Sequence, residues 1–235
     1  MCCCVCQVVF CERLCHVPWL IFDIRNRIIR VENTPYKKVD DHACYKSRWS
    51  HKISIYWGVD MRIETERLCI RNFEKKDAEG LLELLAHPHV NCYAGEKIDT
   101  LAEAYTHISE ANPQYDLAVC LKDTDAFIGT LFGAGDGEDT YSPCWNFLPE
   151  YCGKGYATEA AKAYFDYLFN EIGLRRLYAY TEEDNISSQN VCRKLGMRHE
   201  GTFKEFISFV NNPDCTPRYE NTLQFAILKK EWNAH

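Results

Sequence analysis

The chain has 235 residues, of which 46 % are apolar and 26 % are charged. This composition is typical of a soluble globular protein with enough apolar material for a core. No apolar run approaches about 18 residues, so we expect neither a transmembrane helix nor a membrane partner. The formal net charge of −7 argues against a nucleic-acid partner, because neutralisation of phosphates by Lys and Arg supplies most of that affinity.

The first 60 residues differ in composition from the rest. Residues 1–60 hold nine Lys or Arg against six Asp or Glu, whereas residues 61–235 hold 18 against 28. The Cys-rich start lacks the paired spacing of zinc sites, so we expect no metal ion. It also lacks the basic start of a signal peptide, and attachment through palmitoylated Cys stays open. Because no hydrophobic period precedes Met61, we expect residues 1–60 to be an unstructured extension, or sequence upstream of a natural start at Met61. Residues 61–235 are then the domain.

Beyond Met61 the hydrophobic spacing predicts regular elements. In chain order these are a strand at 66–72, helices at 77–88 and 100–113, strands at 117–121, 127–132 and 144–148, a helix after Glu159 to about 173, a strand at 177–180, a helix at 185–196, and strands at 203–209 and 223–228. Asp77 is the predicted cap of the first helix, and Thr100 with Glu103 forms a capping box for the second. Residues 133–140 and 211–218 are predicted loops. This order indicates a mixed α/β fold around one sheet.

The most informative feature is the loop Cys152-Gly-Lys-Gly-Tyr-Ala157, between a strand and a helix. Glycines let the backbone approach a ligand closely, and the unpaired N–H groups of the following helix can bind phosphate. A nucleotide P-loop is excluded because Lys154 is followed by Gly155 rather than Ser or Thr. A dinucleotide-binding fingerprint is only half present, and the preceding strands form hairpins. A plain glycine turn stays open on this loop alone.

Three further segments accompany the loop. Thr65-Glu-Arg-Leu68 opens the domain, Asn185-Ile-Ser-Ser188 follows the loop, and Lys194-Leu195-Gly196 follows that. Together with Pro149-Glu-Tyr-Cys-Gly-Lys-Gly-Tyr-Ala-Thr-Glu-Ala160, they resemble the GNAT superfamily of acetyl-CoA-dependent N-acetyltransferases. The resemblance covers about residues 62–232 and is strongest to the subgroup that includes the ribosomal-protein N-terminal acetyltransferases.

The resemblance implies a single α/β domain whose mixed, mostly antiparallel sheet is splayed in the middle and flanked by helices on both faces. It implies transfer of an acetyl group from acetyl-CoA to a primary amine by direct attack. A non-catalytic acyl-CoA-binding sensor with the same fold is the alternative. The implied coenzyme-binding residues are Phe147, Leu148, Cys152, Gly153, Lys154, Gly155, Tyr156, Ala157, Thr158, Asn185 and Ser188.

The resemblance also implies separate roles within that set. A main-chain N–H of Phe147 or Leu148 would polarise the thioester, Asn185 would hold the pantetheine arm, and Ser188 would protonate the departing thiolate. Asn185 and Ser188 are equally typical of a helix cap. Cys152 stands where the family motif has Gln or Arg, and Cys192 stands where many members have Tyr.

The base that removes the amine proton cannot be assigned from the sequence. Glu205, His199 and Glu220 lie on the last predicted strands, but charged residues there are typical of a solvated surface. The acidic balance of residues 61–235 favours a cationic acceptor, either a peptide N-terminus or a small molecule. We further expect a cytoplasmic protein that is a monomer or a homodimer.

Overall fold

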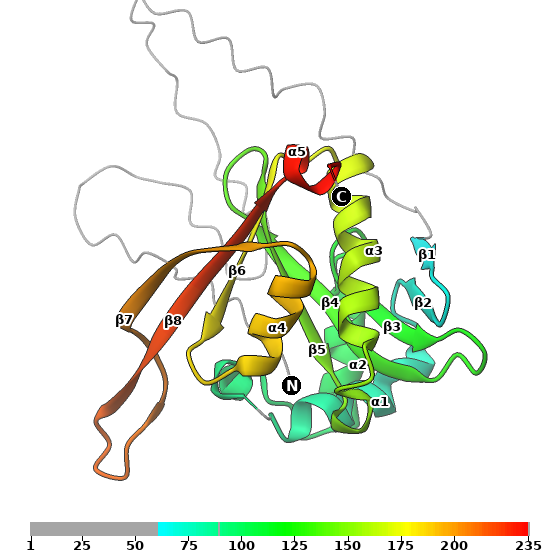
Figure 1. Cartoon of the computed structure of the whole chain (residues 1–235). Coiled ribbons are helices and arrows are strands. Elements are labelled where there is room, and N and C mark those ends of the chain that lie inside the picture. Colours follow the sequence, from blue (N-terminus) through cyan, green and yellow to red (C-terminus); the bar gives the residue numbers. More distant parts are fainter. Residues whose placement is uncertain (1–60, 89, 235) are drawn as a thin grey trace, which may run out of the picture. The chain divides into compact units, whose positions relative to one another are not determined.

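The computed structural model describes residues 61–88 and 90–234 (Figure 1). The expectations for residues 1–60 lie outside this part. The strands are β1 (Arg62–Glu64), β2 (Leu68–Arg71), β3 (Leu117–Leu121), β4 (Phe127–Gly135), β5 (Thr140–Phe147), β6 (Arg176–Glu182), β7 (Arg198–Asn211) and β8 (Pro217–Leu228). The α-helices are α1 (Ala78–Ala86), α2 (Leu101–Glu110), α3 (Tyr156–Asn170), α4 (Ile186–Lys194) and α5 (Lys229–Trp232). Short 3-10 helices are η1 (Lys75–Asp77), η2 (Asn91–Glu96) and η3 (Pro149–Tyr151).

The strands described form one sheet in the order β1-β2-β3-β4-β5-β6-β8-β7. Every neighbouring pair is antiparallel except β5 and β6. These two parallel strands pair only at Thr140 with Arg176 and at Tyr141 with Leu177. Beyond that point they diverge, which confirms the expected split in the middle of the sheet.

Pro143 explains where the split begins. Leu148 N–H donates to the Ile128 carbonyl on β4. Backbone groups alternate in direction along an antiparallel ladder, so the backbone nitrogen of Pro143, an odd number of residues away, points from β4 toward β6. Continuing the parallel ladder would require an N–H of residue 143 for the Tyr178 carbonyl, and proline has none. The Ser142 hydroxyl donates to that carbonyl instead, at 3.2 Å. The ladder ends because its next donor is missing.

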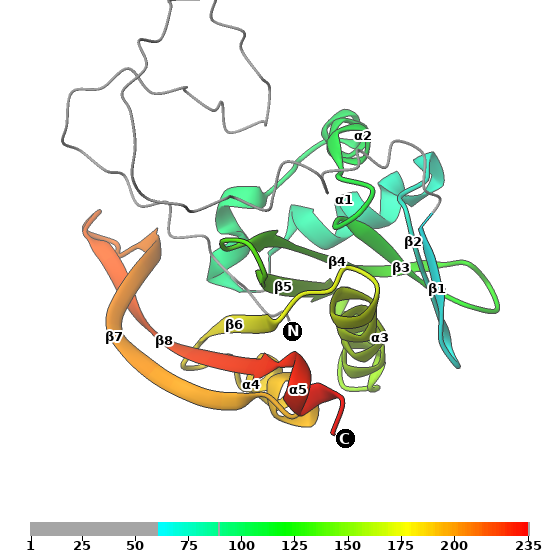
Figure 2. The same cartoon turned by 90° about the horizontal axis from the view of Figure 1, so that it is seen from above.

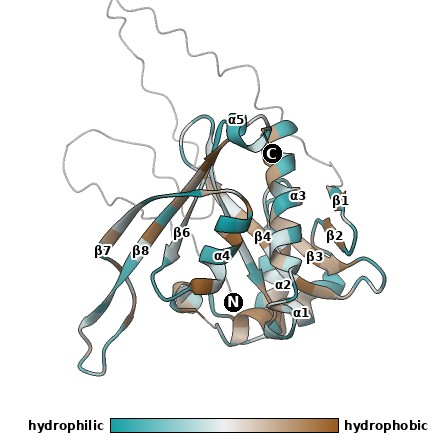
Figure 3. Ribbon diagram, in the orientation of Figure 1, coloured by the Kyte–Doolittle hydropathy of each residue, from teal (hydrophilic) through white to brown (hydrophobic). Residues whose placement is uncertain are grey.

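Helices cover both faces of the sheet, as expected. Figure 2 shows α1 and α2 on one face and α3 and α4 on the other, with the β7–β8 hairpin curving toward the side of α1 and η2. Trp145, Phe165 and Phe225 are among the fully buried side chains between the sheet and α3. Figure 3 shows the hairpin tip as hydrophilic and the central strands as largely hydrophobic. No helix within 61–88 and 90–234 is long and apolar enough to cross a membrane.

Several predicted boundaries were wrong. Half of the expected loop at 133–140 is strand, because β4 runs to Gly135 and β5 begins at Thr140. At Gly133 a Cβ would lie 2.2 Å from the Ser142 carbonyl oxygen, so only glycine fits there. Helix α3 begins at Tyr156, before Glu159. Strands β7 and β8 are longer than predicted, and β1 and α5 were not predicted. The capping box of α2 is confirmed.

The predicted cap Asp77 has a different role. Its carboxylate accepts hydrogen bonds from both terminal nitrogens of Arg71, at 2.8 and 3.0 Å, and from the Glu74 N–H at 2.7 Å. No hydrogen bond from its side chain caps α1. Arg71 and Asp77 are both buried. This bidentate pair ties the start of α1 to strand β2.

Candidate active site

The predicted coenzyme loop has the backbone that its glycines suggest. Gly153 and Gly155 have φ angles of +74° and +86°, a region that residues with a Cβ adopt reluctantly. A Cβ at Gly153 would meet no atom within 4 Å, and one at Gly155 would meet only a guanidinium nitrogen of Arg67 at 3.4 Å. The space beside the loop is therefore open, and conformation rather than crowding requires glycine here.

The loop ends in unpaired helix N–H groups. The first intrahelical bond of α3 runs from Glu159 N–H to the Gly155 carbonyl, at 3.0 Å. The N–H groups of Tyr156, Ala157 and Thr158 therefore have no acceptor within the helix. They lie at the positive end of the helix dipole, which suits a diphosphate.

An ion-pair network anchors this helix end to the first strands. Arg67 donates through Nε to Glu159 Oε2 at 2.7 Å and through a terminal nitrogen to the Lys154 carbonyl at 3.1 Å. Thr65 Oγ1 donates to Glu159 Oε1 at 2.6 Å. Burial raises the pKa of Glu159, but these hydrogen bonds outweigh burial and hold the pKa below its ordinary value. The Thr65–Leu68 segment noted in the sequence thus fixes the loop, with Glu159 ionised.

The loop and α4 line one cleft of about 160 Å³. From the predicted set, the cleft includes Phe147, Cys152, Gly153, Gly155, Ala157 and Thr158. Helix α4 and η3 add residues that were not predicted, namely Tyr151, Ser187, Asn190, Val191 and Lys194. Leu148, Lys154, Tyr156, Asn185 and Ser188 do not line this cleft. The α4 residues share one helix face, a signal that the sequence carried at positions 187, 190, 191 and 194.

Asn185 and Ser188 lie at the start of α4. The Asn185 Oδ1 accepts a hydrogen bond from Ser188 N–H at 3.2 Å, so Asn185 caps the helix. Both residues are buried. The capping role considered from the sequence is therefore present for Asn185, while the proposed roles of both residues toward the coenzyme stay predictions.

The two candidates for polarising a thioester differ in geometry. Leu148 N–H donates to the Ile128 carbonyl at 3.0 Å, so it is already used within the sheet. Alternation then turns the Phe147 N–H to the opposite edge of β5, where β6 has diverged. Of the two, Phe147 is the residue whose N–H faces the gap.

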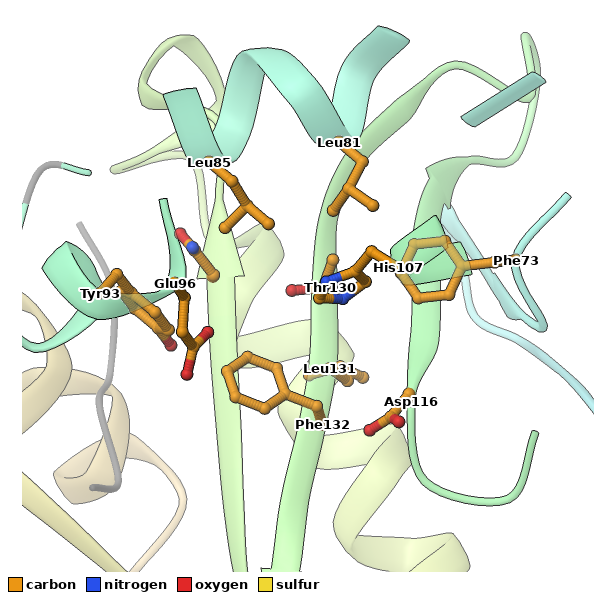
Figure 4. A pocket seen from close by; sticks show the side chains of 11 residues that line it. Phe73, Leu81, Leu85, Tyr93, Glu96, His107, Asp116, Thr130, Leu131 and Phe132 are labelled. Carbon is orange, nitrogen blue, oxygen red and sulfur yellow. The ribbon is translucent and has the colours of Figure 1, made fainter. Parts of the chain in front are cut away.

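A second pocket, of about 210 Å³, lies on the other face of β5 (Figure 4). Leu81, Leu85, Phe73, Tyr93 and Phe132 supply its apolar surface, and Glu96, His107, Asp116, Thr130 and Asn146 its polar groups. Figure 4 shows Glu96 and Asp116 on either side of Phe132, with both carboxylates directed inward. Asn146 and Phe147 are consecutive on a strand and point to opposite faces, so the end of β5 separates this pocket from the coenzyme cleft.

The ionisable groups of this second pocket are perturbed by burial. Burial raises the pKa of Glu96, and the nearby Asp116 raises it further. Burial also raises the pKa of Asp116, although a hydrogen bond from Asn112 and the charge of His107 oppose it. Burial lowers the pKa of His107. The pocket was not predicted, because its members come from seven separate segments with no common motif.

Comparison with known proteins gives a consistent result. Residues 67–198 match the acetyltransferase (GNAT) domain family. The chain is 38 % identical over 176 residues to an uncharacterised N-acetyltransferase, YnaD, of Bacillus subtilis, covering 74 % of this chain and all of that protein. It is 37 % identical over 87 residues to the spermidine N(1)-acetyltransferase of Escherichia coli K12, covering 37 % of this chain and 43 % of that enzyme.

A crystal structure of a GNAT-family acetyltransferase from Bacillus anthracis superposes with a TM-score of 0.64 at 34 % identity, covering 73 % of this chain and all of that one. The family match spans more than half of the chain and includes the coenzyme loop, the split in the sheet and α4. The protein is a member of the GNAT family of N-acetyltransferases.

Proposed function

We propose that this N-acetyltransferase transfers the acetyl group of acetyl-CoA to an aliphatic amine that carries a second positive charge. The observation that carries the proposal is the end of β5. Its Phe147 N–H faces the gap between β5 and β6, the coenzyme cleft lies on one side of the strand, and the pocket with Glu96 and Asp116 lies on the other. A thioester in the gap is accessible to an amine from the second pocket.

The coenzyme end of the reaction follows from the loop. The diphosphate of acetyl-CoA binds the N–H groups of Tyr156, Ala157 and Thr158, and the open left-handed glycines leave room for its oxygens. Phe147 N–H donates to the thioester oxygen as it becomes anionic, an interaction that strengthens in the transition state. Asn185 and Ser188 keep the roles that the family resemblance implies, holding the pantetheine arm and protonating the thiolate.

The acceptor end follows from the charges of the second pocket. An ammonium group is stabilised beside the Asp116 and Glu96 carboxylates, and a methylene chain packs on Phe132 and Leu85. The E. coli relative acts on spermidine, an amine of this class. The subgroup resemblance instead favours a peptide N-terminus, whose following residues would have to supply the second charge.

An acceptor panel tests the proposal. We expect spermidine and 1,5-diaminopentane to release CoA from acetyl-CoA with a higher kcat/KM than 1-aminopentane, which has the same stem and one charge. Asp116→Asn should raise KM for the diamine and leave the monoamine unchanged, with the exposed Asp123→Asn as control. Equal kcat/KM for diamine and monoamine would exclude a dicationic acceptor. Coenzyme binding without transfer to any amine would indicate a sensor.

A further inference from the structure

Glu182, at the end of β6, is a buried carboxylate without a cation. Three charged side chains are buried within 61–88 and 90–234: Arg71, Asp77 and Glu182, with exposed fractions of 4, 1 and 5 %. The first two neutralise each other. Glu182 accepts hydrogen bonds only from neutral groups, its own N–H and Asn185 Nδ2 at 3.3 Å. The charges that act on it are negative, Glu220 and Asp184.

Such a group destabilises the fold. Removing a carboxylate from water without a cation costs several kcal/mol in general, and Glu182 has no compensation comparable to the Arg71–Asp77 pair. Gln189 Nε2 nevertheless holds the Glu182 carbonyl at 3.2 Å, so the end of β6 is held firmly against α4. A buried, uncompensated and well-positioned carboxylate is typical of a functional site.

The strand register places Glu182 at the gap. The last β5–β6 pair is Tyr141 with Leu177. Five residues further along each strand stand Asn146 and Glu182, at the same level on opposite sides of the divergence. Side chains of paired parallel strands share a face and alternate, so both belong to the face opposite Leu177 and α3. The second pocket, which Asn146 lines, lies on this face. The Phe147 N–H, which points toward β6, is next to it along β5.

Aromatic side chains lie beside Glu182. It lines a small pocket with Tyr180, Phe206 and Phe209. The ring centroids of Tyr180 and Phe206 lie 5.8 Å apart. The register of β7 shifts between Phe203 and Ile207, and Glu205 there has a φ of +47°. Such an irregularity redirects side chains and is common beside active sites. Aromatic faces next to a carboxylate favour an ammonium ion over a neutral or anionic ligand.

We propose that the Glu182 carboxylate receives the reacting ammonium group of the acceptor and removes its proton. This inference rests on the proposed acetyl transfer. One proton passes from nitrogen to Glu182, and the free amine attacks the thioester carbon. The C–N bond forms and the C–S bond breaks. The second proton leaves the nitrogen as the amide forms and ends on the CoA sulfur, while Glu182 releases its proton to water.

The environment of Glu182 makes it a stronger base than an ordinary carboxylate. Burial raises its pKa, and the charges of Glu220 and Asp184 raise it further, against opposing hydrogen bonds from its own N–H and from Asn185. Its pKa is therefore closer to that of an amine, which favours proton transfer. The three bases considered from the sequence are placed less well. Glu205 and His199 are exposed, and Glu220, unlike Glu182, has a cationic partner, the Arg218 guanidinium at 3.8 Å.

The pH dependence of Glu182→Gln tests the proposal. With 1,5-diaminopentane, whose amines titrate near pH 10 like that of lysine, we expect kcat/KM of the unsubstituted enzyme to be level with pH as long as Glu182 is ionised and the amine is protonated. It should fall in acid as Glu182 is protonated. The variant depends on amine already deprotonated in solution, so its kcat/KM should rise about tenfold per pH unit. At pH 7 the kcat/KM of the variant should be about 10²-fold lower or more. The difference in kcat/KM between the two proteins should decrease with rising pH.

Glu183→Gln is the matched control. Glu183 is the next residue, is exposed, and pairs with Lys204 and Asn221; its removal should leave the pH profile level. The proposal would be overturned if the loss of kcat/KM in Glu182→Gln stayed constant with pH. It would also be overturned if the kcat/KM–pH profile of Glu182→Gln equalled that of Glu183→Gln. Melting temperatures show whether both variants are folded, and formate should partly rescue Glu182→Ala.

Binding separates this inference from the proposed function. In the presence of CoA, where no transfer occurs, Glu182→Gln should bind 1,5-diaminopentane at least about tenfold more weakly by calorimetry. Acetyl-CoA affinity should be unchanged. If the diamine binds through Glu182 but is never acetylated, the proposed acceptor class is wrong, whereas binding of an ammonium group by Glu182 is supported. If both proteins bind the diamine equally, Glu182 does not receive the amine.

Discussion

Two glycines at opposite ends of α3 allow the coenzyme loop to be tested with an internal control. Gly155 precedes the helix with a φ of +86°, and Gly173 follows it with a φ of +85°. Replacing either by Asp forces a residue with a Cβ into the left-handed region, which costs about 1 kcal/mol. A Cβ at Gly173 meets no atom within 4 Å. Both variants should therefore carry the same backbone cost, although the helix dipole favours the new carboxylate at Gly155 and disfavours it at Gly173.

Only the variant at Gly155 places a carboxylate at the proposed diphosphate site. It removes the approach of phosphate to the α3 N–H groups and adds charge repulsion, so acetyl-CoA affinity should fall by about 2 kcal/mol or more, roughly 30-fold. Arg67 lies close enough to offset part of the added charge, so Gly155→Ala should show the conformational part alone. Calorimetry gives the affinities and thermal unfolding the stabilities. Equal acetyl-CoA affinity for Gly155→Asp and Gly173→Asp would refute the diphosphate assignment.

Three further predictions concern stability and catalysis. Ser188→Ala should lower kcat by about 10²-fold with little change in acetyl-CoA affinity if its hydroxyl protonates the thiolate; unchanged kcat with a lower melting temperature would leave only a structural role. Asp77→Asn should lower the free energy of unfolding by about 2 kcal/mol or more, because Arg71 stays buried with weaker partners, and denaturant titration measures this. A chain that starts at Met61 should keep the melting temperature and acetyl-CoA affinity of the full chain; a large loss of either would show that residues 1–60 support the domain.

The coenzyme loop was predictable because its chemistry is local. Glycine spacing, the helix start and the motif from Pro149 to Ala160 lie within one short stretch, and each reports on backbone conformation rather than on distant contacts. The same holds for the Thr100–Glu103 capping box. Even so, the helix start was misplaced by a few residues, since Tyr156 and Ala157 fit a loop and a first helical turn equally well.

The acceptor side was not predictable, for a physical reason. Glu96, Asp116 and Glu182 come from η2, the segment before β3, and the end of β6, and no local period joins them. Glu182 in particular resembles its exposed neighbour Glu183 in sequence. What distinguishes the two is which face of β6 each occupies and how far that strand runs beyond its last pair with β5, and both depend on tertiary register.

The split itself did have a sequence signal, in Pro143. Proline within a central strand is unusual, because it cannot donate to the ladder. Here its missing N–H falls on the β6 side, two residues beyond the last paired position, and Ser142 satisfies the Tyr178 carbonyl that would have accepted from it. If the ladder continued, the Phe147 N–H would be directed at a β6 carbonyl rather than at a substrate, and Asn146 and Glu182 would be adjacent in a closed sheet. One absent donor therefore accounts for both the open edge proposed to polarise the thioester and the separation of Asn146 from Glu182, the proposed base.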